Sequence, residues 1–447
     1  MINYAQVKKG LLLDIVSLVL ALAFGILTTP LIAKITGKVG YGIWTTFFTI
    51  TAYLHLSDIG VIALFSRNYI FHREKENREQ IIKDFANVIL LLLFLSIILF
   101  TLSPLLSRGF LSFIDIQSDE IYTANILILA VVPFGLFTKF FLAIVHAQQH
   151  FVAEKAIQSL RPLLFFIAVY AVYHYSDTYR SLASAYFLVQ ICLIIPVLFV
   201  LKKNRIFIPI RLSQASLTGI FSTLRRSFYL FVDAFFYHII FFTDAIVISK
   251  LMGPAHAAEY SITYKSTEIL RQLVWMLPNL LSPGIAAFIA QKNFLEVKKV
   301  FIRTTRICFL IGCCFFTGVA TLNHSFVSLW VGESFYAGDL VSFLMALSLI
   351  GLAWVHTSSI ILWGFMDARA LGLSTGFEAA LNLSLSIILC IHYGLPGVIL
   401  GTIVGNFANY FWRTYRACRL LNISYGSFLL RLTAKDLPFA ASPSGHQ

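Results

Sequence analysis

Long apolar segments, separated by short polar stretches, run through almost the whole chain of 447 residues. A helix that crosses the hydrocarbon core of a bilayer, about 30 Å thick, needs about 20 apolar residues. Twelve segments reach this length, and each predicts a transmembrane helix: 11–34, 41–66, 84–107, 123–147, 156–175, 181–201, 228–251, 258–288, 305–331, 339–364, 372–393 and 395–417. Two of the turns, at Gly37 and at Gly253-Pro254, are tight. The pattern predicts an all-α, polytopic membrane protein of about 12 transmembrane helices.

Basic residues are unevenly distributed between the predicted loops. With the N-terminus in the cytoplasm, 26 of the 34 Lys and Arg residues fall in inside segments and five in outside loops. Lys and Arg concentrate in the loops that stay in the cytoplasm, so we expect both termini there. The same distribution accounts for the formal net charge of +13 without nucleic acid as a partner.

The composition supports lipid as the surrounding solvent. Only 12% of the residues are charged, about half the share in soluble domains. The six cysteines lie in or beside apolar segments and show no metal-ligand or redox spacing, so we expect no cofactor and no metal. No predicted outside loop is long enough to hold a soluble domain.

The second half of the chain repeats the spacing of the first. When segment 248–253 is aligned with segment 32–37, which forms the same turn, the predicted spans of the two halves superpose. Six spans per half make the repeat parallel, and such halves usually enclose a central substrate site. We therefore expect a six-helix lobe at 1–201, a basic cytoplasmic linker at 202–227, a second six-helix lobe at 228–417 and a basic cytoplasmic tail at 418–447.

Several short motifs together resemble a known family. They are Tyr41-Gly42-Ile43-Trp44, the segments 53–60, 244–253 and 259–262, Leu277-Pro278, Ser282-Pro283 and Gly394-Leu395-Pro396-Gly397-Val398. Nearly the whole chain resembles the Wzx-type polysaccharide flippases of the multidrug/oligosaccharidyl-lipid/polysaccharide exporter superfamily. One departure is the end of the chain, because members of that family often have further spans after the twelfth. The resemblance leaves open whether the C-terminus is shortened or replaced.

The resemblance implies both an architecture and a cargo. It implies two six-helix lobes around a central cavity in the inner (cytoplasmic) membrane. The cargo is an oligosaccharide linked to undecaprenyl diphosphate, such as an O-antigen repeat unit of lipopolysaccharide, which crosses to the outer leaflet by alternating access. The resemblance is also compatible with two further kinds of partner: membrane lipid and other proteins of polysaccharide assembly.

Basic side chains inside the spans are the candidates for binding such a cargo. A charge at the centre of a membrane helix costs about 2.5–3.5 kcal/mol, so it usually faces a cavity or a partner. A guanidinium group also matches phosphate oxygens bidentately. The alignment of the two halves pairs His55 with Arg271, and it brings Lys139 beside His356. The candidates are Arg271, Lys139, Lys265, His55 and His356. The alternative is structural, since a lone histidine on an apolar helix is more often part of the packing.

Four acidic residues in the spans are candidates for ion coupling or for structural pairs: Asp58, Asp244, Glu268 and Glu378. Asp244 and Lys265 lie at equal depth on either side of the same turn, so the two can form a buried pair. Glu268 lies within one helical turn of Lys265 and Arg271 and can neutralise either. Asp58 either couples ions or holds a helix, and Glu378 either lines the cavity or lies at the membrane interface.

Two other classes of function remain as alternatives. A multidrug exporter of the same superfamily carries organic cations and is expected to have an acidic cavity, in contrast to Lys139 and Arg271. A membrane-embedded polysaccharide polymerase or glycosyltransferase is expected to carry catalytic residues in a sizeable outside loop. The sequence favours a transporter that is not an enzyme, and the buried charges argue against a purely structural membrane subunit.

Overall fold

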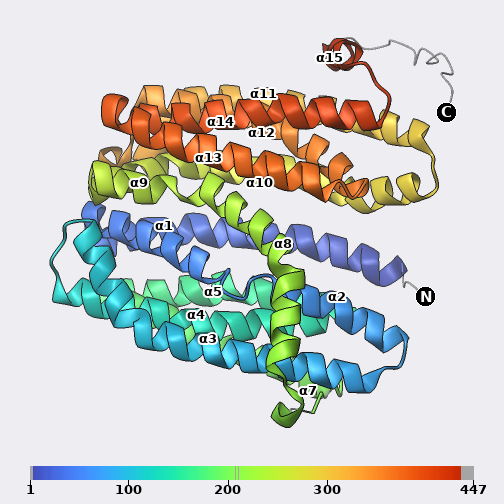
Figure 1. The fold of residues 1–447 in the computed structure, drawn as a ribbon. Coiled ribbons are helices and arrows are strands. Elements are labelled where there is room, and N and C mark those ends of the chain that lie inside the picture. The colour runs from blue at the N-terminus through green and yellow to red at the C-terminus, as the bar shows by residue number, and fades with distance from the viewer. Residues whose placement is uncertain (1–3, 207, 210, 434–447) are drawn as a thin grey trace. The chain divides into compact units, whose positions relative to one another are not determined.

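The structure is a computed structural model that describes residues 4–206, 208–209 and 211–433 (Figure 1). These residues form 15 α-helices and two short 3-10 helices, and no strand occurs among them. The predicted all-α fold is confirmed. The chain divides into two compact units, which are described separately.

Unit 1 comprises Met1–His238 with Met252–Ala258. Its helices are α1 (Tyr4–Leu54), α2 (Val61–Glu74), α3 (Arg78–Phe113), α4 (Asp119–Ala147), α5 (Phe151–Tyr175), α6 (Tyr179–Cys192), α7 (Ile194–Lys203), the 3-10 turn η1 (Leu212–Gln214) and most of α8 (Leu217–Phe242).

Unit 2 comprises Ile239–Leu251 with Glu259–Gln447. Its elements are α9 (Asp244–Leu251), most of α10 (Pro254–Ala290), α11 (Phe294–Trp330), η2 (Glu333–Phe335), α12 (Asp339–Gly364), α13 (Ala368–Tyr393), α14 (Leu395–Leu420) and α15 (Tyr425–Thr433). The lobe boundaries expected from the sequence stay predictions, and positions 434–447 of the expected tail lie outside the described part.

Most of the residues in each of the 12 predicted spans are helical. Within the described residues, nine helices are long and apolar enough to cross a membrane, or ten if the bent pair α8–α9 is one span. A straight helix over Ile15–Leu54 would be about 60 Å long, twice the thickness of the hydrocarbon core. Gly37, with φ 66° and ψ 179°, divides it into two helical segments. The expected turn at Gly37 is therefore confirmed, and the number of 12 spans stays a prediction.

The predicted second span, 41–66, is not one continuous helix. The helix α1 ends at Leu54 and α2 begins at Val61, and residues 55–60 between them form turns. Ile59 and Gly60 are both left-handed, with φ of 49° and 72°. The helical hydrogen bonds are interrupted here, so residues 55–60 present side chains that a regular helix would direct elsewhere.

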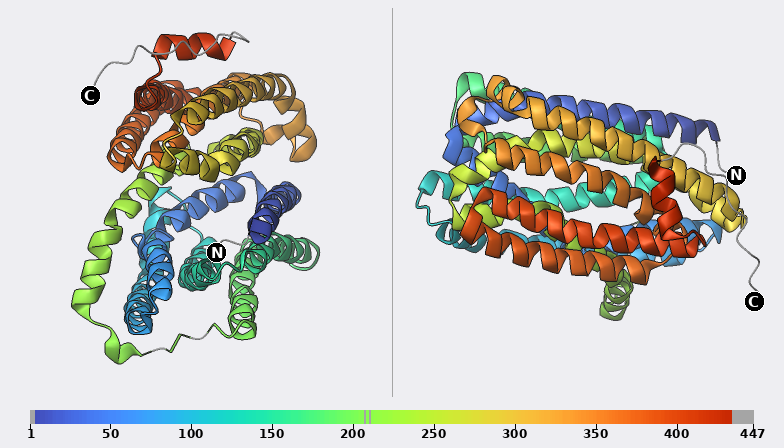
Figure 2. Two further views of the ribbon diagram at one scale, coloured as in Figure 1. Left: turned by 90° about the vertical axis from the view of Figure 1, so that its right-hand side faces the viewer. Right: turned by 90° about the horizontal axis from the view of Figure 1, so that it is seen from above.

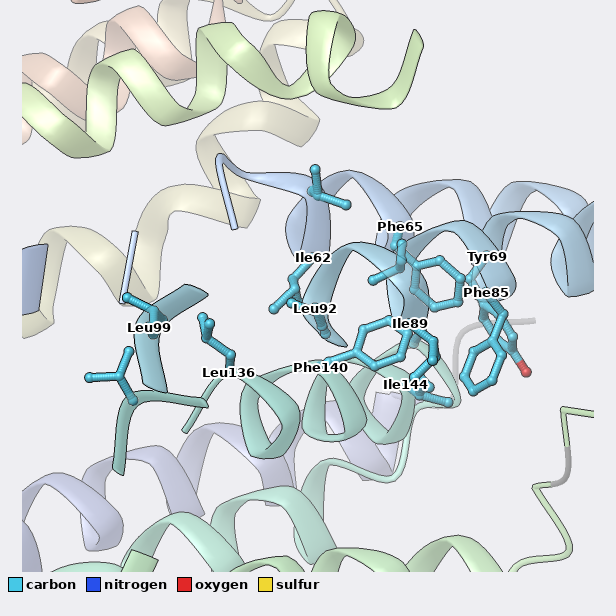
Figure 3. Close-up of a cluster of buried hydrophobic side chains, with 14 residues drawn as sticks. Ile62, Phe65, Tyr69, Phe85, Ile89, Leu92, Leu99, Leu136, Phe140 and Ile144 are labelled. Carbon is cyan, nitrogen blue, oxygen red and sulfur yellow. The ribbon is translucent and has the colours of Figure 1, made fainter. Parts of the chain in front are cut away.

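Aromatic and branched side chains from α2, α3 and α4 form the core of unit 1 (Figure 3). The ring of Phe140 lies 5.0 Å from that of Phe65 and 5.5 Å from that of Phe85. Lipid tails are as apolar as these side chains, so close van der Waals packing, rather than exclusion of water, stabilises the cluster. This packing fixes α4, which carries Lys139, against the helix that follows the break.

Three glycines bring α14 into backbone contact with α13 in unit 2. A Cβ atom on Gly397 would lie 2.0 Å from the carbonyl oxygen of Leu389, and one on Gly401 would lie 2.4 Å from the nitrogen of Ser386. Gly405 continues the row one turn further and faces Asn382. Small residues at this spacing let membrane helices approach closely. Side chains that continue the row, at 409 and 413, are thereby directed into the same helix–helix interface.

Candidate functional site

Asp58 lies in the break between α1 and α2 and binds residues of both α2 and α4. Its side chain is 2% exposed, and its Oδ1 accepts a hydrogen bond from Lys139 Nζ of α4 at 3.1 Å. Its Oδ2 accepts from the backbone N–H of Ile62 at 3.3 Å, one of the N–H groups that a helix start leaves without an intrahelical partner. Asp58 therefore holds the start of α2 and the ammonium group of α4 at once.

His55 packs into the same place. A Cβ atom on Gly135 would lie 2.9 Å from Cε1 of the His55 ring, so the histidine reaches α4 only because residue 135 is glycine. Gly135 precedes Lys139 by about one helical turn, and His55, Asp58 and Lys139 form one cluster. The Lys139 side chain is 48% exposed although its partner is buried. An ammonium group has three N–H donors, so Lys139 can bind a second anion.

Arg271 of unit 2 lies against two aromatic rings. Its guanidinium carbon is 4.5 Å from the ring of Phe241 and 4.5 Å from that of Trp275, and the residue is 7% exposed. A guanidinium can stack on ring faces while its N–H groups point outward in its own plane. The rings therefore stabilise the guanidinium group among apolar helices without neutralising its positive charge.

Trp275 also contacts the second basic candidate of unit 2. The His356 ring of α12 stacks on it with the centroids 4.4 Å apart and the planes 12° from parallel. His356 Nε2 donates to Asn279 Oδ1 at 2.9 Å, and Trp275 Nε1 donates to the carbonyl oxygen of Leu352 at 3.0 Å. The structure thus brings Arg271 and His356 together on one tryptophan. Trp275 was not among the residues predicted from the sequence, although it lies one helical turn after Arg271 and so shares its helix face.

Lys265 pairs with Glu268, one of the two partners considered for that carboxylate, and Asp244 has partners other than Lys265. Lys265 Nζ donates to Glu268 at 2.9 Å. Asp244 accepts from the hydroxyl of Tyr260 at 2.5 Å and from Thr402 at 3.3 Å. The predicted Asp244–Lys265 pair is wrong because equal depth does not fix the helix face. Residues 260 and 265 point about 140° apart around α10, so the face that brings Tyr260 to Asp244 turns Lys265 away.

Glu378 lies between α13 and α14. The carboxylate accepts from Asn409 Nδ2, in the position that follows the row of glycines. One turn further, Arg413 donates to the hydroxyls of Ser374, Ser359 and Thr375 at 2.9, 3.0 and 2.8 Å. The structure therefore places Glu378 in a polar helix–helix contact, and the two positions considered for it in the membrane stay predictions. Arg413, which lies in the last predicted span and was not among the candidate site residues, is part of this contact.

Comparison with known proteins shows the family. Residues 7–288 match the family model described as "Polysaccharide biosynthesis protein". The chain is 24% identical over 412 residues to a Salmonella typhi protein named "Putative O-antigen transporter", with 87% of this chain and 90% of that protein aligned.

Solved structures are similar in fold. One is an inward-facing multidrug resistance MATE family transporter of the MOP superfamily, with a TM-score of 0.74, 14% identity and coverage of 89% of this chain and 94% of that chain. Another is a MOP superfamily transporter from Pyrococcus furiosus, with a TM-score of 0.64, 12% identity and coverage of 93% and 96%. Identities this low show the fold alone. The family model matches more than half of this chain. The chain therefore belongs to the polysaccharide biosynthesis protein family, and it has the two-lobed fold of MOP superfamily transporters.

Proposed function

We propose that this protein moves an oligosaccharide linked to undecaprenyl diphosphate from the cytoplasmic to the outer leaflet of the inner membrane by alternating access. The cargo is an O-antigen repeat unit or another surface polysaccharide unit. The observation that carries the proposal is a basic group held inside apolar helices in each unit: Lys139 beside buried Asp58, and Arg271 against Phe241 and Trp275.

The cargo's diphosphate explains why such groups are present. A diphosphate cannot enter hydrocarbon without cations, since each unpaired charge costs several kcal/mol there. The trio Lys265, Glu268 and Arg271 carries one net positive charge. Lys139 retains donors beyond its contact with Asp58, so both units offer N–H groups to phosphate oxygens.

The direction of transport is consistent with the membrane potential. The cytoplasm is negative, so outward movement of two negative charges across about 100 mV releases about 5 kcal/mol, at about 2.3 kcal/mol per charge. The reaction requires no bond to form or break in the cargo. An exporter of organic cations would face electrostatic repulsion from Lys139 and Arg271.

The proposal is tested by reconstituting variants in which the charges of Asp58 and Lys139 in unit 1 are removed. The purified protein in vesicles should expose a fluorescent polyprenyl-diphosphate oligosaccharide to a quencher on the opposite side. In Asp58→Asn with Lys139→Gln, neutral amide groups replace both charges; the amide oxygen at position 58 can still accept from the backbone N–H of Ile62, and the NH2 group there can donate to the amide oxygen at position 139. We expect normal folding and a rate at least about tenfold lower, the loss expected for one charge-assisted phosphate contact.

Asp58→Asn alone is the matched control, because its amide oxygen can keep the cap of α2 while the Lys139 cation remains, now without its carboxylate partner. We expect it to keep most of the rate. Full activity of the double variant would assign the pair a structural role only. Transport of a cationic dye but of no diphosphate-linked sugar by the wild-type protein would favour the multidrug alternative.

A further inference from the structure

A cavity lies at the corner between α14 and α15 of unit 2. Its volume is about 310 Å³. The chain turns there at Asn422, which is left-handed with φ 50°, and α15 then runs across the direction of α14 (Figure 2). The polar side chains that line the cavity come from the end of α14, the turn and the start of α15: Tyr415, Arg419, Asn422, Ser424 and Tyr425.

The packing of α15 gives this cavity a fixed wall. Phe428 is fully buried and stacks on Phe301 of α11, with the centroids 5.1 Å apart and the planes 15° from parallel. Leu432, one turn further, is also buried, whereas Leu430 on the other side of α15 is exposed. The apolar face of α15 therefore packs on α11 and fixes this helix beside the cavity. The excess of Lys and Arg predicts that this end of α14 lies on the cytoplasmic side, where lipid headgroups are expected.

The lining of the cavity consists of hydrogen-bond donors without an acid. No Asp or Glu lines it, and within the described part of the chain the structure gives the guanidinium of Arg419 no acceptor. The hydroxyl of Tyr425 is buried and has no hydrogen-bond partner among the described residues. Burial raises the pKa of Tyr425, so the hydroxyl remains protonated and can donate. Arg416, about one turn before Arg419, instead binds Asp367 at 2.8 Å.

We propose that this cavity binds a phosphate group, and that the group belongs to an anionic membrane lipid. Arginine supplies paired donors for phosphate oxygens, and the Asn422 amide and the Ser424 and Tyr425 hydroxyls add further donors. The exposed ring of Tyr415 lines the site, as expected at the edge of a bilayer. Basic pockets on the cytoplasmic side of membrane helices bind anionic headgroups, and the charge distribution predicts that side for α15. The site is independent of the proposed transport.

The test measures lipid bound to the full-length protein. Protein purified in detergent is titrated with phosphatidylglycerol, phosphatidylcholine or inorganic phosphate, and bound lipid is counted by native mass spectrometry. We expect saturable binding of phosphatidylglycerol. Arg419→Gln should weaken it at least about fivefold, the value of one basic residue near an anionic headgroup.

Two further variants make the result specific. Tyr425→Phe removes only the buried hydroxyl, so it should leave the thermal stability of the lipid-free protein unchanged or higher and weaken phosphatidylglycerol binding. Arg303→Gln removes an exposed charge of α11 that does not line the cavity, and it should change binding less than about twofold, because solvent and salt screen an exposed charge that makes no direct contact with the lipid.

Each outcome decides the proposal. Binding of inorganic phosphate, dependent on Arg419 and without binding of phosphatidylglycerol, would support the phosphate site and reject the lipid as its source. Equal weakening by Arg419→Gln and Arg303→Gln, or unchanged binding in both Arg419→Gln and Tyr425→Phe, would overturn the site.

Discussion

Arg271 keeps a positive charge inside the membrane region because aromatic rings, not an acid alone, surround it. Cation–π contacts of a desolvated guanidinium contribute about 2 kcal/mol. Glu268 is already bonded to Lys265, so the loss of Arg271 does not leave that carboxylate without a partner. The residue can therefore be removed with a smaller effect on folding than on the binding of an anion.

The Arg271 side chain gives the first prediction. Arg271→Ala should abolish export of the lipid-linked sugar in cells while the protein level and membrane insertion stay nearly unchanged. Arg271→Lys should recover only part of the export, because an ammonium group cannot make the bidentate contact. Export is measured as surface polysaccharide, and the protein level by immunoblot of membranes.

A double variant separates cargo binding from charge balance. If Arg271 serves only to balance Glu268, Arg271→Ala with Glu268→Ala should restore export. We expect no restoration. Full export in the double variant would remove Arg271 from the binding site.

At the scale of helices, the sequence predicted the helix positions and turns that depend on the local pattern of apolar residues and glycines. Apolar segments long enough to cross a bilayer, together with glycine turns, located the helices, including the turn at Gly37. The break at 55–60 was not predicted, because the surrounding span is apolar enough to read as continuous helix. Asp58, followed by Gly60, was the available signal, since an aspartate that caps a helix start is typical of a turn.

Helix faces were less predictable than helix positions. The depth of Asp244 and Lys265 followed from counting residues, but the partner of each depended on the rotation of α10, which only the packing determines. Trp275 and Arg413 were missed for a related reason. Their roles come from the neighbours that tertiary structure brings to them, His356 in one case and three hydroxyls in the other.

The glycine row of α14 predicts that close packing against α13 contributes to stability. A Cβ atom on Gly401 would lie 2.4 Å from a backbone nitrogen of α13, so Gly401→Ala must separate the helices. Overpacking of this kind costs about 1–3 kcal/mol, and we expect a lower temperature of thermal unfolding in detergent. Gly372→Ala in α13 is the control, because its Cβ atom would meet nothing within 4 Å. That variant should be neutral or stabilised, since alanine favours helix. Equal stability of the two variants would contradict close packing of α13 and α14.

At the scale of the whole molecule, orientation in the membrane decides which end of each helix meets the cytoplasm. The 36 residues of α3 span about 54 Å, more than the thickness of a bilayer with its headgroups. Glu76 precedes this helix and Gln117 follows it, and both are exposed. The two positions must therefore lie on opposite sides of the membrane, and the excess of Lys and Arg around Glu76 predicts that it lies inside.

Cysteine labelling tests this orientation directly. In a variant with the six native cysteines replaced by alanine, Gln117→Cys should react with a membrane-impermeant maleimide in intact cells. Glu76→Cys and Glu296→Cys should react only after the inner membrane is permeabilised, because all basic segments are expected in the cytoplasm. Labelling of position 76 but not of 117 in intact cells would reverse the orientation, and with it the proposed direction of transport. Labelling of both would show that α3 does not cross the membrane, against the length and composition of this helix.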